Sequence, residues 1–133
     1  GSTRSPQWVH GGIALGPKPR SYRIELNKGI KRAAMFSALS SKVANNEMIV
    51  VDNITATEYK TKDMVKMLAA VGAAKKTLVV LPEVNSFVIK SCANIEGVKT
   101  TQWNTINVYD ILNCDTLIVA QDAVAKIEEV YAR

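Results

Sequence analysis

The sequence is poor in the residues that most often build catalytic and metal sites. It contains one histidine, His10, and two cysteines, Cys92 and Cys114, which stand 22 positions apart with no CxxC-like spacing. These residues offer neither a Ser-His-acid triad nor a set of metal ligands. We therefore expect no metal, no cofactor, and two reduced cysteines as in an intracellular protein.

Long apolar runs and nucleotide-binding glycine motifs are also absent from the sequence. No apolar run approaches the roughly 18 residues that span a bilayer, and the chain opens on Gly1-Ser2-Thr3-Arg4 with no apolar stretch behind it. Neither GxGxxG nor GxxxxGK[ST] stands between an expected strand and an expected helix. The sequence predicts no membrane partner, no signal segment and no small-molecule substrate.

Aromatic residues are scarce, at 6% of the 133 residues, although 47% of the residues are hydrophobic. A chain of this length buries one core and is too short to divide comfortably into two. The core should consist of Val, Ile, Leu, Ala and Met side chains. We predict a single domain over residues 28–133, preceded by an arm over residues 1–27.

Helical and strand patterns alternate along the predicted domain. The first helix should run from Lys28 to Asn45-Asn46, and its expected apolar face consists of Ile30, Ala33 or Ala34, Leu39 and Val43. Strands are expected at 48–51, 77–81 and 116–120, with a weaker strand at 98–101. Further helices are expected at 61–71, with Thr61 as N-cap and Gly72 as its stop, and at 83–92, 108–112 and 121–131. Apolar strands separated by helices predict an α/β fold, a mostly parallel sheet with helices on both faces in a Rossmann-like three-layer arrangement.

Two of the expected strands lead into an acidic residue, Asp52 after the first and Glu83 after the second. Sheets of this kind often place active sites at the carboxyl ends of their strands. One interpretation is therefore an enzymatic or small-molecule-binding doubly wound domain with an incidental basic tail. The partners for such a site are missing, because His10 lies in the arm, and single acids after strands are usually caps or turn formers. We predict that the chain is not an enzyme.

The excess positive charge is confined to the first quarter of the chain. Residues 1–32 hold seven basic residues against the single acid Glu25, a net charge of +6, whereas residues 33–133 hold ten basic and eleven acidic residues, a net charge of −1. This asymmetry is typical of a polyanion-binding arm on a neutral body.

The arm should be a loop or an extended segment without regular structure, since prolines and glycines recur through it. Pro17 and Pro19 fix φ and bias the residues before them toward extended backbone, so Lys18 and Arg20 should stand on a stiff strip. A disordered basic tail is the alternative interpretation.

The arm combines basic side chains, the Gln7 amide and the Trp8 ring. In RNA-binding proteins, cations pair with phosphates and aromatic rings stack on unpaired bases. Trp8 has an alternative role, burial against the domain. On the first helix, the spacing 28, 31, 32 puts three cations on one face. We expect this face to contact phosphates, and the alternative is an ordinary solvated helix face. The predicted RNA-binding residues are Arg4, Gln7, Trp8, His10, Lys18, Arg20, Arg23, Lys28, Lys31, Arg32 and Lys42.

Blocks of sequence along the whole chain resemble the bacterial-type family of large-subunit ribosomal protein four. In the first third these blocks are Arg4-Ser5-Pro6-Gln7-Trp8, Gly11-Gly12, Gly16-Pro17-Lys18-Pro19-Arg20 with Tyr22, Lys31-Arg32-Ala33 and Ser37-Ala38-Leu39-Ser40. In the remainder they are Val50-Val51-Asp52, Thr61-Lys62, Leu81-Pro82-Glu83, Asn94-Ile95 with Gly97-Val98, and Asn107-Val108-Tyr109-Asp110. Their order and spacing make the resemblance specific.

The resemblance implies a structural constituent of the large ribosomal subunit that has no catalytic activity. Such a protein binds large-subunit (23S-type) ribosomal RNA early in assembly, contacts neighbouring ribosomal proteins and directs its loop toward the peptide exit tunnel. It would act in the ribosome of a bacterial cytoplasm or of an organelle of bacterial type. A regulatory role on a messenger RNA is a further alternative that the same arm supports.

The chain also departs from the family's pattern. Family members begin with a further strand, a helix and the outgoing arm of the loop, so we expect that about the N-terminal third of the family's length is absent here. Gly29 stands where relatives often keep a basic residue. It should weaken the first helical turn by about 1 kcal/mol relative to alanine.

Overall fold

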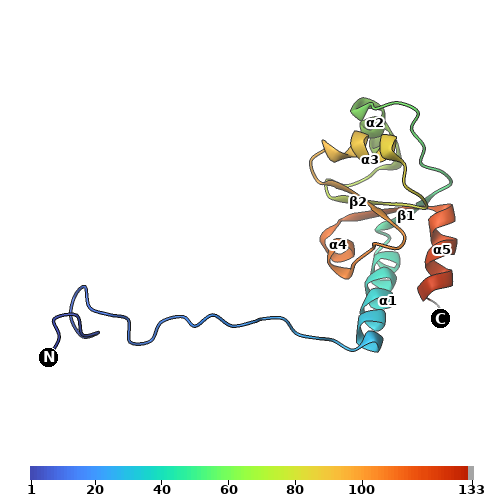
Figure 1. Ribbon diagram of the computed structural model, residues 1–133. Coiled ribbons are helices and arrows are strands. Elements are labelled where there is room, and N and C mark those ends of the chain that lie inside the picture. Colours follow the sequence, from blue (N-terminus) through green and yellow to red (C-terminus); the bar gives the residue numbers. More distant parts are fainter. Residues whose placement is uncertain (132–133) are drawn as a thin grey trace.

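The computed structural model describes residues 1–131, and within them the chain forms five helices and four strands (Figure 1). The helices are α1 (Lys28–Ala44), α2 (Thr61–Val71), α3 (Ser86–Ala93), α4 (Val108–Asn113) and α5 (Gln121–Tyr131). The strands are β1 (Met48–Val51), β2 (Thr77–Leu81), β3 (Val98–Gln102) and β4 (Thr116–Ala120). Residues 132 and 133, the end of the predicted 28–133 domain, lie outside the described residues.

The four strands form one sheet in the order β1-β4-β2-β3, and every pairing is parallel. Every residue of β2 and of β4 is buried, because these two apolar strands occupy the middle of the sheet. The edge strands are less buried, and Lys99 of β3 is exposed. Strands that are apolar along their whole length are typical of a sheet covered on both faces.

Helices cover both faces of the sheet. The connections from β1 to β2 and from β2 to β3 cross the sheet in one direction, and the connection from β3 to β4 returns in the other. Because such crossovers are right-handed, α2 and α3 lie on one face and α4 lies on the opposite face, where α1 and α5 join it (Figure 1). The α/β fold with a parallel sheet is therefore confirmed.

Helix ends agree with the predictions at two positions and differ at two others. Gly72 caps α2 in the left-handed conformation with a φ of 74°, and α1 ends before Asn45 and Asn46 as expected. Thr61, however, is the first helical residue of α2 and its N-cap is Lys60. The helix expected from residue 83 begins only at Ser86, because the Asn85 side chain accepts hydrogen bonds from the backbone N–H groups of residues 87 and 88.

The apolar face predicted for α1 is only partly right, because Leu39 packs against the core but Ile30 and Val43 do not. The structure buries Met35, Ala38 and Lys42, whereas Ile30 and Val43 are 54% and 60% exposed. The first turns of α1, which carry Ile30, project beyond the sheet (Figure 1). The buried face belongs instead to the half of the helix that lies over the sheet and beside α4.

Candidate nucleic-acid interface

The first twelve residues fold back on themselves into a hook at the tip of the arm. The backbone N–H of Trp8 donates to the carbonyl of Ser5 at 3.0 Å, and the N–H of Gly11 donates to the carbonyl of Trp8 at 2.9 Å. The N–H of Gly12 then donates to the carbonyl of Arg4 at 2.8 Å and closes the hook. The sequence predicted a loop or an extended arm here, but not the particular hydrogen bonds that close the hook.

Gly11 is required by the geometry of the hook. A Cβ atom at this position would overlap the backbone carbonyl of Ser5 and would stand 2.9 Å from the carbonyl oxygen of Trp8. His10, just before it, has a φ of 63°, in the left-handed region that side chains rarely adopt. The hook thereby presents Arg4, Gln7, Trp8 and His10 at the surface, and the Trp8 side chain is 59% exposed.

Residues 13–27 form an extended segment between the hook and α1, without helix or strand (Figure 1). Lys18, Arg20 and Arg23 are exposed along it. The Arg20 guanidinium lies over the ring of Tyr22, at 4.5 Å from the ring centroid, a cation–π contact. Tyr22 was not predicted as a site residue, although an aromatic ring two residues from an arginine in an extended segment is a visible signal.

Exposed basic residues continue from the arm onto the first turns of α1. Lys28, Lys31 and Arg32 are all exposed. The first turn of α1 contains no acidic residue, and the Asn27 N-cap makes no side-chain capping bond. Cations near a helix N-terminus oppose the helix dipole at a cost of about 0.3–1 kcal/mol each. A bound anion at this end would offset that cost.

Lys42 does not belong to this exposed set. Its side chain is almost fully buried, and its ammonium donates to the Glu47 carboxylate and, at 2.6 Å, to the carbonyl of Cys114. By helical spacing Lys42 lies on the same side of α1 as Lys28 and Lys31, but about three turns beyond Lys31, where this side of the helix packs against the end of α4. The prediction that Lys42 faces RNA is corrected on this ground.

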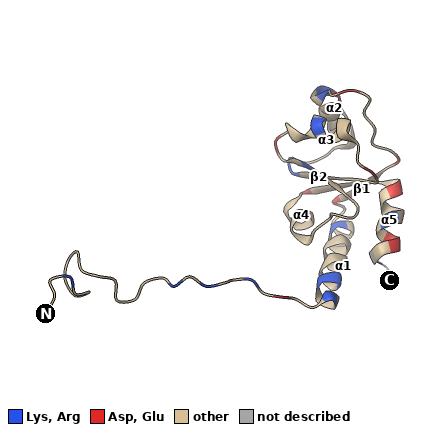
Figure 2. Cartoon of the chain, in the orientation of Figure 1, with Lys and Arg blue, Asp and Glu red and all other residues tan. Residues whose placement is uncertain are grey.

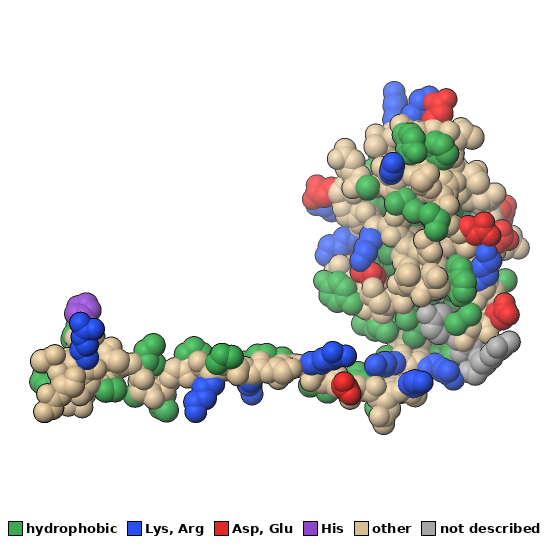
Figure 3. Space-filling view, in the orientation of Figure 1, with side chains coloured by type: hydrophobic (Ala, Val, Ile, Leu, Met, Phe, Trp, Pro, Cys, Tyr) green, Lys and Arg blue, Asp and Glu red, His purple; other side chains and the backbone are tan. Residues whose placement is uncertain are grey.

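Basic side chains follow the arm from the hook to α1, with the acid Glu25 between them (Figures 2 and 3). All ten of the predicted residues other than Lys42 are exposed, and they are Arg4, Gln7, Trp8, His10, Lys18, Arg20, Arg23, Lys28, Lys31 and Arg32. The structure therefore places the predicted groups along the exposed arm, from the hook to the first turns of α1.

The carboxyl ends of the strands, where an enzyme of this fold would act, form a crevice of about 1010 Å³. Glu83 lies in it, and the Lys126 ammonium stands 3.3 Å from the Glu83 carboxylate and donates to the carbonyl of Pro82 at 3.1 Å. Among residues 1–131 no group of three or more His, Cys, Asp or Glu side chains is placed to hold a metal ion. His10 lies far away at the arm's tip, so it supplies no base to this crevice (Figure 3).

The two cysteines are buried and unpaired. Burial raises the pKa of both the Cys92 and the Cys114 thiols, and the nearby Lys42 only partly opposes this for Cys114. Since the thiolate is the reactive form, these thiols are poor nucleophiles at neutral pH. Their role is to pack in the hydrophobic core.

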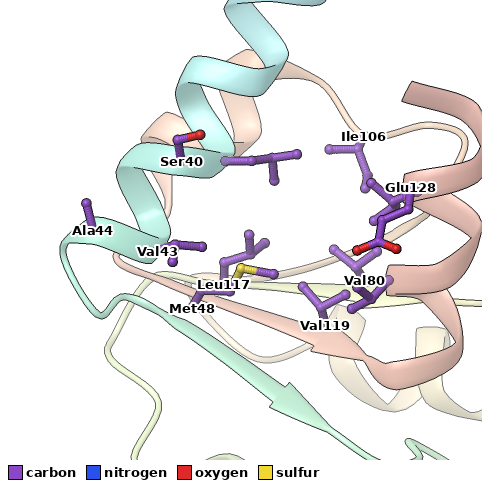
Figure 4. Close-up of a pocket in the computed structure, with 12 residues that line it drawn as sticks. Ser40, Val43, Ala44, Met48, Val80, Ile106, Leu117, Val119 and Glu128 are labelled. Atoms are coloured by element: carbon purple, nitrogen blue, oxygen red, sulfur yellow. The ribbon is translucent and has the colours of Figure 1, made fainter. Parts of the chain in front are cut away.

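A second hollow, the α1–α5 groove, is apolar and has a volume of about 440 Å³ (Figure 4). It lies between α1 and α5 over the sheet, and Ser40 and Glu128 contribute its polar groups. Aliphatic side chains form the rest of its lining: Leu39, Val43, Ala44, Met48, Val80, Ile106, Leu117, Val119, Val124 and Ile127. This lining can bury an apolar surface and offers no acid–base pair.

By fold and surface, the chain is an α/β domain with a projecting cationic arm, an arrangement typical of proteins that bind polyanions. None of the helices within residues 1–131 is long and apolar enough to cross a membrane. The sequence model of the Ribosomal protein L4/L1 family matches residues 1–130. The chain belongs to this family.

Individual relatives support the same assignment. The chain is 54% identical over 132 residues to the large ribosomal subunit protein uL4 of Clostridium perfringens, with 99% of this chain and 63% of the relative covered. It is 51% identical to the protein of the same name from Clostridium novyi, with 64% of that relative covered. The predicted family is confirmed, and the relatives' names agree with the prediction that the chain is not an enzyme. The chain spans somewhat less than two thirds of the length of these relatives.

Proposed function

We propose that this chain is a structural constituent of the large ribosomal subunit that binds large-subunit ribosomal RNA through its arm and the first turns of α1. The exposed cationic strip carries this proposal. It comprises Arg4, Lys18, Arg20, Arg23, Lys28, Lys31 and Arg32. Phosphate contacts supply most of the affinity in such complexes and depend steeply on salt.

Each part of the strip has a distinct role in this proposal. The extended segment, with Lys18 and Arg20 flanked by prolines, lies along phosphates that a folded domain would not reach. The hook adds Gln7 for hydrogen bonding and Trp8 for stacking on an unpaired base. Lys28, Lys31 and the α1 N-terminus bind phosphate where the arm meets the domain.

The proposal extends to assembly, position in the subunit and cellular location, which we infer from the family. The chain would join the subunit early in assembly, direct its arm toward the peptide exit tunnel, and contact neighbouring ribosomal proteins through its α/β domain. It would reside in a cytoplasmic ribosome of bacterial type, or in an organelle ribosome of that type.

Salt dependence separates this function from the alternative of a small-molecule-binding domain with an incidental tail. Binding to a large-subunit rRNA transcript should weaken linearly in log Kd against log salt, with a slope of roughly 0.7 to 0.9 for each of about four to seven phosphate contacts. Protein purified without nuclease should also carry nucleic acid, visible in its absorbance ratio. A flat salt dependence with little affinity for the transcript would exclude the proposed function.

A further inference from the structure

An aromatic and cationic cluster lies on the domain at a distance from the arm. Tyr59 sits in the loop between β1 and α2, and its ring centroid is 4.6 Å from that of Phe87 on α3, with the rings tilted by 40°. The Lys90 ammonium lies over the Tyr59 ring at 5.2 Å from its centroid. Nothing in the expected spacing of elements pointed to this cluster, because its members come from two segments far apart in the sequence.

The Tyr59 side chain remains accessible to solvent beside its two partners on α3. Phe87 and Lys90 are three residues apart on α3, so both lie on the same side of that helix and approach the ring from α3. The Tyr59 side chain is nevertheless 56% exposed. A flat group from a partner can therefore stack on the ring without displacing Phe87.

Further lysines lie on α2, the helix that packs beside α3. Lys62 and Lys66 are exposed and four residues apart on α2, so they share one face of that helix. Lys60 is exposed next to them but is paired with Glu58, and Asp63 is the other acid of this region. Four lysines, at positions 60, 62, 66 and 90, thus stand against two acids. No ion pair engages Lys62 or Lys66 within the described part of the chain.

This surface is separate from the arm. The helices α2 and α3 lie on the far side of the sheet from the point where the arm joins α1 (Figure 1). Basic residues are present on α2 and α3 at that end of the domain, whereas acidic residues mark α5 (Figure 2). The two cationic surfaces cannot be one contact, and each would meet a different stretch of a large RNA.

We propose that Tyr59, Phe87 and Lys90, together with Lys62 and Lys66, form a second RNA-contact surface, the Tyr59 platform, which stacks an unpaired nucleotide of the ribosomal RNA on the Tyr59 ring. An exposed ring bordered by lysines fits unpaired RNA, because the ring stacks on a base of any type and the lysines bind the phosphates on either side. The inference rests on the proposed rRNA partner and adds a place where the domain itself, and not the arm, holds that RNA.

The test uses the whole chain and a large-subunit rRNA transcript from Clostridium perfringens, whose protein is 54% identical. Tyr59→Leu removes the stacking ring and should weaken binding by about 5- to 150-fold, whereas Tyr59→Phe keeps the ring and should bind like the parent chain. Lys62→Gln with Lys66→Gln should lower the salt slope by about 1.4 to 1.8. Lys75→Gln with Lys76→Gln is the matched control, because it removes the same charge from an exposed loop away from Tyr59 and should change the slope little.

The outcomes distinguish this inference from the proposed function. If the parent chain fails to bind the transcript, both the proposed function and the Tyr59 platform are overturned. If the parent chain binds but Tyr59→Leu and the Lys62/Lys66 variant bind equally well, only the Tyr59 platform is overturned, and an acidic protein surface becomes the better partner for these lysines. An equal loss in the Lys75/Lys76 control would also overturn it. Thermal unfolding of Tyr59→Leu and Tyr59→Phe checks folding, and loss of affinity in Tyr59→Leu at an unchanged melting temperature supports the platform.

Discussion

The Lys42 ammonium donates a hydrogen bond of 2.6 Å to the backbone carbonyl of Cys114, and so ties α1 to the end of α4 across 72 residues of sequence. The same ammonium is paired with the Glu47 carboxylate. Lys42→Met should therefore lower the free energy of unfolding by roughly 1 to 3 kcal/mol, since it leaves a buried carbonyl without its donor. Urea denaturation measures this loss.

RNA affinity of the Lys42→Met variant should stay unchanged, because the side chain is buried and faces the core. Lys31→Gln is the matched comparison, since Lys31 is exposed on the same helix. It should weaken RNA binding and leave stability nearly unaltered. The reverse pattern, with Lys42→Met folding normally but binding RNA poorly, would return Lys42 to the RNA-facing strip.

Periodicity predicted the elements of this fold well and the faces of its helices less well. Strands such as 77–81 and 116–120 are recognisable because every position after the initial threonine is apolar, as is typical of buried parallel strands. Which face of α1 is buried depends on where the sheet ends, and the tertiary structure determines this, not the local sequence of the helix. From sequence alone a lysine is expected at the surface, even where its aliphatic stem enters the core. Lys42 was misassigned for this reason.

The candidate interface shows the same division. Exposed cations in a proline- and glycine-rich segment are readable from composition, and this is how Arg4, Lys18 and Arg20 were found. The hook depends on backbone hydrogen bonds, such as that from Gly12 to Arg4, which no side-chain pattern specifies. The contact between Tyr59 and Phe87 depends on the packing of two distant segments, so sequence spacing could not reveal it.

Trp8 should serve RNA binding and not the core. Its ring is exposed on the hook, away from the buried cluster of the domain, so Trp8→Ala should leave the melting temperature nearly unchanged. Affinity for the rRNA transcript should fall by about 1 to 3 kcal/mol with the loss of a stacked base. A large drop in melting temperature with intact RNA affinity would show instead that the ring packs on the domain.

The hook's shape should matter independently of its side chains. In Gly11→Ala, the new methyl group would overlap the Ser5 carbonyl, so the turn must open. Gly12→Ala is the natural control, because a Cβ at that position meets its nearest neighbour at an ordinary distance of 3.5 Å. We expect weaker RNA binding from Gly11→Ala alone, measured by filter binding, with both variants equally stable. Equal affinities for the two variants would mean that the closed hook is not used.

The α1–α5 groove should make the isolated chain associate with a second copy, since an uncovered apolar surface favours association. Sedimentation over a range of protein concentrations measures this. Val43→Glu places a charge in the groove and should shift the chain toward monomer. Val65→Glu, at an exposed position on α2 outside the groove, should not. A parent chain that stays monomeric at every concentration would refute the association.

The most direct test of the account is the salt dependence of RNA binding after deletion of residues 1–23. The deletion removes Arg4, Lys18, Arg20 and Arg23 together with the hook, but no helix or strand, because α1 begins at Lys28. Circular dichroism and cooperative unfolding should therefore persist. Four fewer phosphate contacts should flatten the plot of log Kd against log salt by about three units of slope, and most of the affinity at physiological salt should disappear. A shortened chain that binds the large-subunit rRNA transcript as tightly as the parent, and with the same slope, would contradict the account and assign recognition to the α/β domain alone.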